Sequence, residues 1–350
     1  MRWRLWALLA LGIQLAVSSA CSPVWSPGST SDPARSERAS PVAGASIALS
    51  PTPSVTLTAA YAAASGAMSP LWFAADTGLF TQKGLNVELR YIASGTTLVP
   101  ALISDEVQVA LVGGDPVIRA ALGGADLVLV GAPVPVLVFS IYGEPSLTQL
   151  TDLVGKRIAV SRYGTSSDYA ARQALQRAQL TPGRDVAIIQ AGGIPEAMAA
   201  VQAGGVEAAA LSPPTTLQAR AAGLRELLDL GELSIPYLQT AIATGRRQLM
   251  ERPQAMQQFL RAIVEAMSWA RQHPQMAQQI IGRYTHTEDT AILEEAYRAF
   301  VLRFPPWPYV PHEAVEASLA EIAQSDERAR LADATQFYDN RYMAALEAGR

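Results

Sequence analysis

Residues 107–124 read VQVALVGGDPVIRAALGG, and this stretch decides the fold class. The apolar run 107–112 has the continuous character of a strand buried on both faces of a parallel sheet. The Gly-Gly-Asp-Pro turn follows, and then an apolar segment, 116–122, that predicts a helix ended by Gly123 and Gly124. A strand, a turn and a helix in succession are the building unit of an α/β sheet.

The same unit recurs on both sides of this stretch. We expect strands at 56–61, 87–92, 107–112 and 127–130, and helices at 70–80, 98–103 and 116–122. A second series has strands at 157–161, 186–190 and 206–211 and helices at 166–178, 195–203 and from 214 to 223. Residues 107–116 correspond to 205–214, and other landmarks match at nearly the same offset, which favours a duplicated doubly wound α/β unit over a chance likeness.

The chain becomes helical after about residue 240. Residues 253–272 place apolar side chains on one helical face, and shorter helices are expected around 274–283, 288–301 and 312–324.

Composition excludes several classes of protein. The 350 residues leave room for two domains and an extension. Charged residues make up 17% and the net charge is −4, whereas nucleic-acid-binding proteins usually have a strongly basic face, so this class is not indicated. The single Cys permits no internal disulfide, and three scattered His predict no metal site.

The first 54 residues are predicted to lie outside the fold. Residues 1–21 read MRWRLWALLALGIQLAVSSAC, with a basic start, an apolar run too short to span a bilayer, and small residues before Cys21. This stretch resembles a bacterial lipoprotein signal, whose Cys is acylated after cleavage. An ordinary secretory signal with a chance Cys is the alternative. Residues 22–54, rich in Ser, Pro, Ala and Thr, predict a disordered tether with a span of about 30 Å.

No catalytic signature is present, so we predict no catalytic residue. The sequence lacks the phosphate-binding, dinucleotide-binding, nucleophile-elbow and zinc-protease motifs. What remains are polar turns after strands, where open parallel sheets bind ligands. The sharpest turn is 163–168, where Thr165, Ser166 and Ser167 open a helix, and Thr165 and Asp168 have the spacing of a capping box. We read this turn as a polar seat for a ligand; a plain helix cap is the alternative.

The equivalent turns of both series complete the candidate site. The predicted ligand-binding residues are Tyr61, Ala63, Ser65, Ser94, Gly95, Thr96, Gly114, Asp115, Tyr142, Tyr163, Gly164, Thr165, Ser166, Ser167 and Ser212. Asp115 either accepts a hydrogen bond from the ligand or caps its helix. The tyrosines either stack on a flat ligand or pack beneath the loops.

Four stretches resemble one known family. They are residues 70–88 (PLWFAADTGLFTQKGLNVE), residues 95–97 through 109–110, residues 153–160 (LVGKRIAV) with 164–168 (GTSSD), and residues 201–208 (VQAGGVEA). The family is the solute-binding proteins of nitrate, taurine, alkanesulfonate and pyrimidine-precursor ABC importers, and the resemblance covers about residues 56–300.

The resemblance implies a two-lobed periplasmic-binding-protein fold of type II, each lobe a doubly wound sheet, hinged by two crossovers near residues 139–143 and 240–244. The implied division is a signal at 1–21, a tether at 22–54, lobe 1 at 55–140, lobe 2 at 141–243, and a return to lobe 1 with C-terminal helices at 244–350. The implied partners are a membrane permease and its separate ATPase subunit. The protein is then a monomer, anchored by its lipid on the extracytoplasmic face of the cell membrane.

The resemblance also suggests a ligand. Where the family usually has a bulky or acidic residue, this chain has Ser212, which enlarges the cleft and disfavours ammonium-bearing ligands such as taurine. Riboflavin, from the vitamin branch of the family, is the first expected ligand and no cofactor is expected. A thiamin pyrimidine precursor and an alkanesulfonate are the alternatives.

Two other functions stay open. A pyrimidine synthase shares this fold, but its chemistry needs a Lys and a His in the cleft, and neither Lys83 and Lys156 nor any His falls at a cleft turn. We therefore expect no enzyme. A sensor domain without a transport role is the third possibility.

Overall fold

The structure is a computed structural model that describes residues 55–349. The predicted signal at 1–21, with Cys21, and the tether at 22–54 lie outside the described residues. Within the described part, no helix is both long and apolar enough to cross a membrane.

The first sheet has the strand order β2-β1-β3-β10-β4. Its strands are β1 (Val55–Tyr61), β2 (Leu85–Tyr91), β3 (Val109–Val112), β4 (Leu127–Val136) and β10 (Pro236–Gly245). β1 pairs in parallel with β2 and β3, whereas β10 runs antiparallel to β3 and β4. We call this sheet and the helices on it lobe 1.

The second sheet repeats this arrangement with the order β7-β6-β8-β5-β9. Its strands are β5 (Ser140–Gly143), β6 (Arg157–Val160), β7 (Ala187–Gln190), β8 (Ala208–Leu211) and β9 (Arg225–Asp229). β6 is parallel to β7 and β8, and β5 is antiparallel to β8 and β9. We call this sheet and its helices lobe 2. The predicted α/β class with two sheets is confirmed, although both sheets are mixed.

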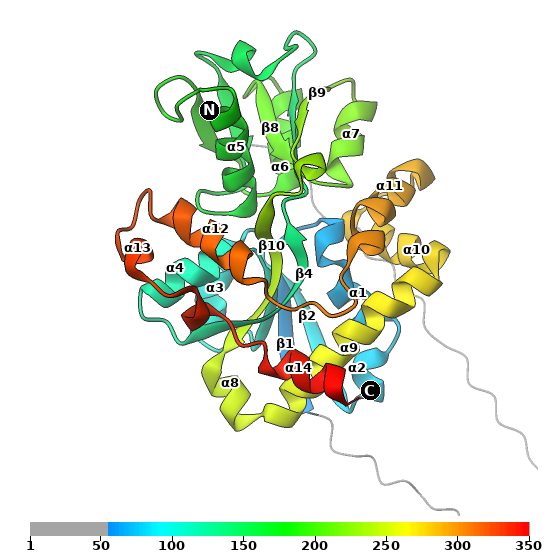
Figure 1. Ribbon diagram of the computed structural model, residues 1–350. Helices are drawn as coiled ribbons and strands as arrows, with labels where there is room; N and C mark the ends of the chain where they lie inside the picture. Colours follow the sequence, from blue (N-terminus) through cyan, green and yellow to red (C-terminus); the bar gives the residue numbers. More distant parts are fainter. Residues whose placement is uncertain (1–54, 350) are drawn as a thin grey trace, which may run out of the picture. The chain divides into compact units, whose positions relative to one another are not determined.

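The chain crosses between the sheets twice, at residues 137–139 and 230–235. The second crossing differs from the expectation at 240–244, because these residues lie in β10 and pair with β3 and β4. The first crossing precedes residues 140–143, which form β5. β4 and β10 lie side by side and lead from lobe 1 toward lobe 2 (Figure 1).

Helices cover both faces of the lobe 1 sheet. The N-terminal part supplies α1 (Ser69–Asp76), α2 (Leu79–Gln82), α3 (Gly95–Ile103) and α4 (Gly114–Leu122). The C-terminal part supplies α8 (Arg246–Glu251), α9 (Pro253–Gln272), α10 (Pro274–Thr285), α11 (Thr290–Phe300), α12 (His312–Ile322), α13 (Arg328–Leu331) and α14 (Arg341–Ala348). The helix expected at 70–80 is two helices, because Gly78 adopts a φ of +72° between them.

Lobe 2 has three α-helices among the described residues: α5 (Ser166–Arg177), α6 (Ile194–Gln202) and α7 (Thr215–Ala221). Short 3₁₀ helices are η1 (Gly66–Met68), η2 (Leu150–Leu153), η3 (Gly231–Leu233), η4 (Val301–Arg303) and η5 (Ala334–Phe337).

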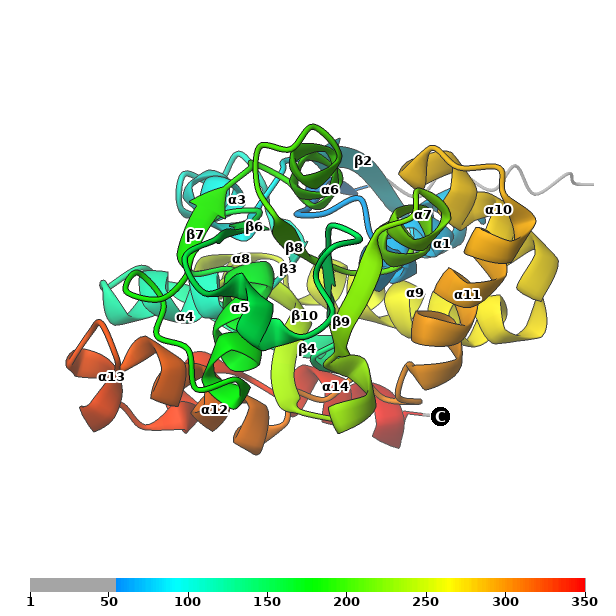
Figure 2. The same ribbon diagram turned by 90° about the horizontal axis from the view of Figure 1, so that it is seen from above.

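Three apolar clusters hold these layers together. One face of the lobe 1 sheet packs with α1, α9, α10, α11 and α14 around Trp72 and Phe259. The other face packs with α3, α4 and α12 around Leu129 and Ile322. Lobe 2 has its own core around Tyr142. The C-terminal helices therefore lie on lobe 1. In the view from above in Figure 2, α10 and α11 lie on one side of the molecule and α12 and α13 on the other.

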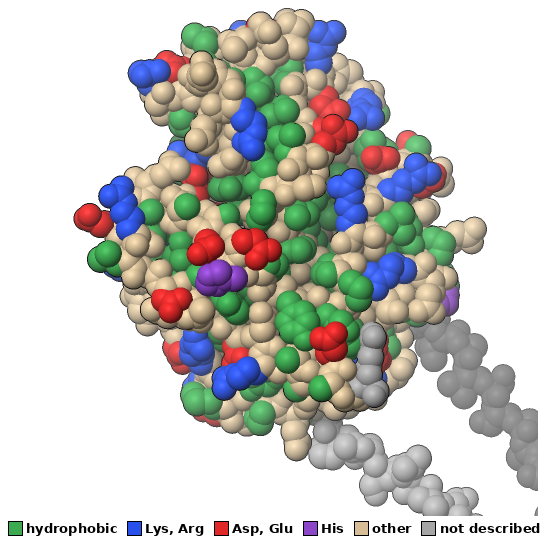
Figure 3. All heavy atoms as spheres, in the orientation of Figure 1, with side chains coloured by type: hydrophobic (Ala, Val, Ile, Leu, Met, Phe, Trp, Pro, Cys, Tyr) green, Lys and Arg blue, Asp and Glu red, His purple; other side chains and the backbone are tan. Residues whose placement is uncertain are grey.

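Charge is dispersed over the face seen in Figure 3, where acidic and basic side chains alternate without a large patch of one sign. This dispersion fits the small net charge of −4.

Candidate functional site

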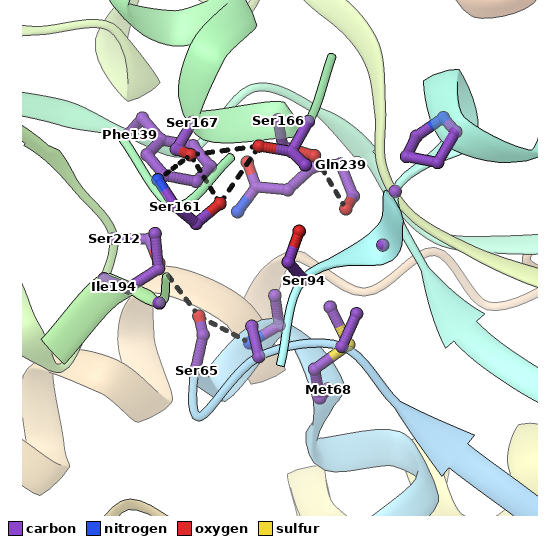
Figure 4. Close-up of a pocket in the computed structure, with 18 of the residues that line it drawn as sticks. Ser65, Met68, Ser94, Phe139, Ser161, Ser166, Ser167, Ile194, Ser212 and Gln239 are labelled. Carbon is purple, nitrogen blue, oxygen red and sulfur yellow. Dashed lines mark hydrogen bonds between the residues drawn. The ribbon is translucent and has the colours of Figure 1, made fainter. Parts of the chain in front are cut away.

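A cavity lies between the two lobes, and both lobes line it (Figure 4). Its volume is about 50 Å³. Since one water-sized sphere needs about 10–15 Å³ in such a measure, the space holds a small group rather than a large molecule. The lining residues are Ala62, Ala63, Ser65, Ala67, Met68, Tyr91, Ser94, Gly95, Gly113, Pro116, Phe139, Ser161, Thr165, Ser166, Ser167, Gly193, Ile194, Ser212 and Gln239.

Four α-helices begin at this cavity. The N-cap residues of α3, α4, α5 and α6 are Ser94, Gly113, Thr165 and Gly193, and all four line it. The first N–H groups of a helix have no partner within the helix, and the helix dipole is positive at this end. Among the described residues that line the cavity, none is Lys, Arg, His, Asp or Glu. The cavity therefore offers donors and positive potential without a lining counter-charge, which suits an anionic or acceptor-rich group.

Lobe 2 supplies a compact network of hydroxyl groups. Ser161 Oγ lies 3.0 Å from Thr165 Oγ1 and 2.8 Å from Ser167 Oγ, which is itself 3.1 Å from Thr165 Oγ1. The Ser161 N–H also donates to Ser167 Oγ at 2.9 Å. These bonds hold the three hydroxyls in place on the lobe 2 side of the cavity, where Figure 4 shows Ser161, Ser166 and Ser167 together.

The turn at 163–168 is not a capping box. Thr165 makes no side-chain bond to the N-terminus of α5, and its hydroxyl donates to the Arg162 carbonyl at 2.7 Å. Asp168 Oδ2 instead accepts from the Gly164 N–H at 2.9 Å. The turn is thus closed by Asp168, and the first N–H groups of α5 receive no bond from Thr165.

The lobes touch directly at the cavity. Ser65 Oγ lies 3.1 Å from Ser212 Oγ and donates to the Pro213 carbonyl at 3.0 Å. The Gly66 N–H donates to the same carbonyl at 3.3 Å. Ser166 Oγ donates across to the Gln239 carbonyl at 3.4 Å. These bonds enclose the cavity from two sides.

Gln239 also ties the two connecting strands together. Its side-chain Oε1 accepts from the Val138 N–H, and its Nε2 donates to the Val138 carbonyl at 3.3 Å. Because Val138 lies in the first crossing and Gln239 in β10, this pair of bonds holds the hinge beside the cavity.

Eight of the fifteen predicted ligand-binding residues line the cavity. They are Ala63, Ser65, Ser94, Gly95, Thr165, Ser166, Ser167 and Ser212. They come from both lobes and from turns far apart in the sequence. The structure therefore brings together most of the polar turns that the strand ends predict.

The predicted tyrosines lie elsewhere. Tyr142 is fully buried in the core of lobe 2, and Tyr163 is 47% exposed with its hydroxyl donating to the Ile188 carbonyl at 2.8 Å. Tyr61 stacks behind Tyr91, with ring centroids 5.3 Å apart. Only Tyr91, which the sequence analysis missed, reaches the cavity among these rings. The tyrosine-rich rim expected from the sequence is therefore reduced to Tyr91.

Four other predicted residues also stand back from the cavity. Thr96 hydrogen-bonds Ser94 at 3.2 Å, Gly114 packs against Leu238, and Gly164 lies against Arg119. The fourth is Asp115, which is buried and 1% exposed. Asp115 makes no cap bond, since the N-cap of α4 is Gly113. Asp115 therefore does not cap α4, and it is not among the residues that line the cavity.

Sequence reasoning missed several lining residues. Ser161 directly follows strand β6 and could have been found by extending the polar turn back to the end of the strand. Phe139 lies in the first crossing and Gln239 in β10, and no local pattern marks either residue. Four more lining residues lie in turns that were predicted to belong to the site, 62–68 and 113–115, but were not chosen individually: Ala62, Ala67, Met68 and Gly113. The remaining lining residues that were missed are Tyr91, Pro116, Gly193 and Ile194.

Comparison with known proteins gives one family match and two curated relatives. A family model described as NMT1/THI5 like matches residues 66–277. A putative ABC transporter periplasmic binding protein of Brachyspira hyodysenteriae is 28% identical over 177 residues, which is 50% of this chain and 47% of that protein. The taurine-binding periplasmic protein of Escherichia coli is 26% identical over 206 residues, 55% of this chain and 60% of that protein. The chain thus spans about half the length of the curated relatives it matches.

Solved structures show the fold. A protein from Bordetella bronchiseptica RB50 superposes with a TM-score of 0.74 at 18% identity, covering 83% of this chain and 96% of that one. The alkanesulfonate-binding protein of Xanthomonas axonopodis pv. citri, bound to MOPS, gives 0.69 at 21% identity, covering 83% and 99%. A Candida albicans protein described as having the generic periplasmic binding protein fold gives 0.66 at 19% identity, covering 81% and 96%. The predicted periplasmic-binding-protein fold is confirmed.

Proposed function

Because the chain belongs to the NMT1/THI5-like family, we propose that it is the extracytoplasmic solute-binding subunit of an ABC importer. It captures a small organic ligand between its lobes and delivers it to a membrane permease with a separate ATPase subunit. The observation that carries the proposal is the cavity between the lobes, at which α3, α4, α5 and α6 all begin. The names of the two curated relatives support the same role.

The two crossings supply the mechanism. Lobe 2 is joined to lobe 1 by residues 137–139 and 230–235, so it can rotate about them as a hinged unit. The cavity exists only where the lobes meet, so a ligand that contacts both lobes stabilises the closed arrangement. Closure is then the signal that the permease recognises.

The geometry favours a small acid with a short apolar body, such as an alkanesulfonate. The helix N-termini and the hydroxyls of lobe 2 suit its anionic head. Met68, Phe139 and Ile194 suit its hydrocarbon part. Taurine is disfavoured, since its ammonium group would find no carboxylate among the described lining residues.

Riboflavin is the second candidate, and Tyr91 and Phe139 are the observation that favours it. Both rings line the cavity, and Tyr91 is 45% exposed and free to stack on a flat ring. Sites for drug-sized ligands usually measure about 300–1,000 Å³. The volume of about 50 Å³ therefore requires the lobes to stand further apart around riboflavin.

A binding role fits the lining better than an enzymatic one. Lys83 pairs with Glu265 at 2.8 Å and Lys156 approaches Glu144 at 4.0 Å, both away from the cavity. No His is among the described lining residues. The chemistry of a pyrimidine synthase would thus have no Lys or His at this site.

Calorimetric titration of the purified protein with hexanesulfonate, taurine, riboflavin and a thiamin pyrimidine precursor tests the ligand class. We expect saturable binding of hexanesulfonate and weak or no binding of taurine. Saturable binding of riboflavin alone would reverse the order of the two candidates. Binding of none of the four would contradict the ligand assignment.

Membrane anchoring through Cys21 is a separate proposal. Replacing Cys21→Ser should move the protein from the membrane fraction to the soluble fraction in its native host. Retention of this variant in the membrane fraction would rule out acylation of Cys21 as the anchor. Sedimentation of the purified protein tests the proposed monomeric state.

A further inference from the structure

A second group of buried polar side chains lies beside the hinge, outside the cavity. Asp115 on α4, Ser318 on α12 and Tyr237 on β10 are all buried, and each has an oxygen without a hydrogen bond of normal geometry. Unpartnered polar atoms are rare in protein interiors, and here the hydroxyls of Ser318 and Tyr237 both lie next to the Asp115 carboxyl. We call Asp115, Ser318 and Tyr237 the hinge cluster.

Lobe 2 covers this cluster. Ser166 of α5 sits so close to Gly113, two residues before Asp115, that a Cβ there would lie 2.7 Å from Ser166 Oγ. Tyr169 of α5 stacks on Tyr237 with ring centroids 4.1 Å apart and an interplanar angle of 6°. In Figure 1, α5 lies above α12 and α4. Rotation of lobe 2 away from lobe 1 would therefore remove part of the cover from Asp115.

The charged groups around the cluster do not neutralise Asp115. Arg119, on the same helix, donates a hydrogen bond from Nη1 to Ser325 Oγ at 3.1 Å. Glu321 on α12 adds negative charge, and Asp168 on α5 is engaged by Arg172 at 3.1 Å, with Arg172 lying 4.0 Å from Glu321. A carboxylate at Asp115 would thus be buried without an ion pair, which strongly favours its protonated form.

Burial raises the pKa of Asp115 to about 7, and the hydroxyls of Ser318 and Tyr237 and the charge of Arg119 only partly oppose this shift. The pKa of Glu321 is also raised by burial. The pKa values of Tyr169 and Tyr237 are raised further above their usual range, so both rings stay neutral. In an arrangement without lobe 2 over the cluster, water would reach Asp115, and the desolvation that raises its pKa above the ordinary value of 3.8 would be relieved.

We propose that the hinge cluster is a proton-linked switch for closure of the lobes, with protonated Asp115 as its positioning residue. Closure takes up one proton, because only the closed form buries Asp115. The affinity of the proposed ligand site then depends on pH by linkage, although Asp115 does not touch the ligand. This inference rests on the proposed function for its biological meaning, but its test needs no ligand.

The sign follows from the two protonation states. The closed form has the higher pKa, so closure is favoured at low pH. The closed-to-open ratio falls by up to about tenfold per pH unit between the two pKa values, from about 4 to about 7. Above about 7 the ratio no longer changes, because Asp115 is ionised in both forms.

The test measures the distance between spin labels on the two lobes in the ligand-free protein at pH 5 and pH 8. Exposed Ile103 on α3 and exposed Ala199 on α6 are replaced, Ile103→Cys and Ala199→Cys, in a Cys21→Ser background. We expect a larger short-distance population at pH 5 than at pH 8. In Asp115→Asn the two distributions should coincide and resemble that of the parent at pH 5.

Three further variants assign the effect to Asp115. Ser318→Ala removes a hydroxyl that lowers the pKa of Asp115, so the midpoint of the pH response should move upward. Glu321→Gln and the surface control Asp126→Asn should keep a pH response. Identical distributions at pH 5 and pH 8 in the parent, or an unchanged response in Asp115→Asn, would overturn the proposal. Loss of the response in Glu321→Gln alone would assign the switch to Glu321 instead.

Calorimetry with hexanesulfonate separates this inference from the proposed function. At pH 6, in buffers of different ionisation enthalpy, binding should take up nearly one proton in the parent and none in Asp115→Asn. Binding without proton uptake would overturn the coupling. Absence of any binding would contradict the ligand assignment alone, since the label distances still decide the switch.

Discussion

The two lobes share one strand order but contribute different chemistry to the cavity. In both, three parallel strands are followed by one antiparallel strand and then by a last strand that runs parallel to the first three, in the orders β2-β1-β3-β10-β4 and β7-β6-β8-β5-β9. Lobe 2 contributes the bonded hydroxyls of Ser161, Thr165 and Ser167. Lobe 1 contributes mostly small or apolar side chains, such as Ala63, Met68 and Pro116.

The difference shows what the shared topology does and does not determine. In both lobes it brings helix N-termini to the same edge of the sheet, which accounts for the four N-cap residues that line the cavity. The side chains beside these N-termini differ between the lobes, being mostly hydroxyls in lobe 2 and mostly small or apolar in lobe 1. In the proposed function, lobe 2 would hold the polar part of a ligand, and lobe 1, which also carries α8–α14, would provide the wall against which lobe 2 closes.

The largest effect should come from the core of lobe 1. Trp72 is fully buried, stacks on Tyr284 with centroids 4.8 Å apart and meets Tyr61 edge-on at 5.4 Å. Trp72→Ala should lower the free energy of unfolding by about 3–5 kcal/mol. Hydrogen exchange should locate the loss in β1 and β3 and spare β6 and β8. Equal loss of protection in both sheets would show that the two lobes unfold as one unit. The control is Tyr163→Ala, a substitution at an exposed residue.

The next effect concerns ligand binding by lobe 2. Thr165→Ala with Ser166→Ala should weaken hexanesulfonate binding by about 1–3 kcal/mol, since hydrogen bonds to a charged head are lost. The matched lobe 1 variant Ser94→Ala should cost less, and Ser104→Ala, outside the cavity, should cost nothing. Calorimetry measures all three. A larger effect of Ser94→Ala would reverse the assignment of polar and apolar sides.

A smaller effect is expected where the lobes touch. Ser65→Ala removes the bonds to Ser212 and Pro213, each worth about 1 kcal/mol. The same label distances should then show a closed-to-open ratio lowered by about thirtyfold, since about 2 kcal/mol is lost in all. Ser146→Ala, exposed on lobe 2, serves as the control. An unchanged closed population would mean that these hydroxyls do not hold the lobes together.

The smallest effect should come from an ion pair in lobe 2. Arg157 holds the pKa of Glu207 down to about 2, through a bond of 2.6 Å to Oε1. Because Arg157 is largely exposed, Glu207→Gln should cost only about 0.5–1 kcal/mol at pH 7. The folded-state pKa is lowered, so this contribution is present above the unfolded value and fades as pH falls through 4.5 toward 2. Urea unfolding at pH 7 and pH 3.5 measures it, with Glu106→Gln as the control; a cost that does not shrink at pH 3.5 would contradict the pairing.

Segments with a clear hydrophobic period, or with Gly or Pro at their ends, could be predicted from the sequence. The helix at 253–272 has the expected limits, and those of α5 and α6 agree within one residue. Strands that cross or end the sheets were missed, including β9 and β10, and so were α8, α13 and α14. The strands β9 and β10 pair with β5, β3 and β4, which lie far earlier in the sequence. The helices α8, α13 and α14 have 6, 4 and 8 residues, which is too short for a clear helical period.

The position of the turn at 165–167 beside the cavity was predictable for a similar reason. Thr165, Ser166 and Ser167 follow a strand and open a helix, and both facts are local. The tyrosines were misplaced because aromatic side chains are long and their direction depends on packing. Tyr142 lies in a core that only the assembled sheet creates, and Tyr91, which lines the cavity, stacks on Tyr61.

The sequence by itself determined the α/β units, their repetition and the polar turns at the ends of strands. These features depend on hydrophobic period and on Gly, Pro and hydroxyl residues acting within a few positions. Only the tertiary structure decided that Gln239 and Val138 meet at the hinge, that Ser65 reaches Pro213, and that Asp115 is buried without an ion pair. Each of these depends on segments about 100 residues or more apart, and the free energy of burying a polar group is set by what those distant segments place around it.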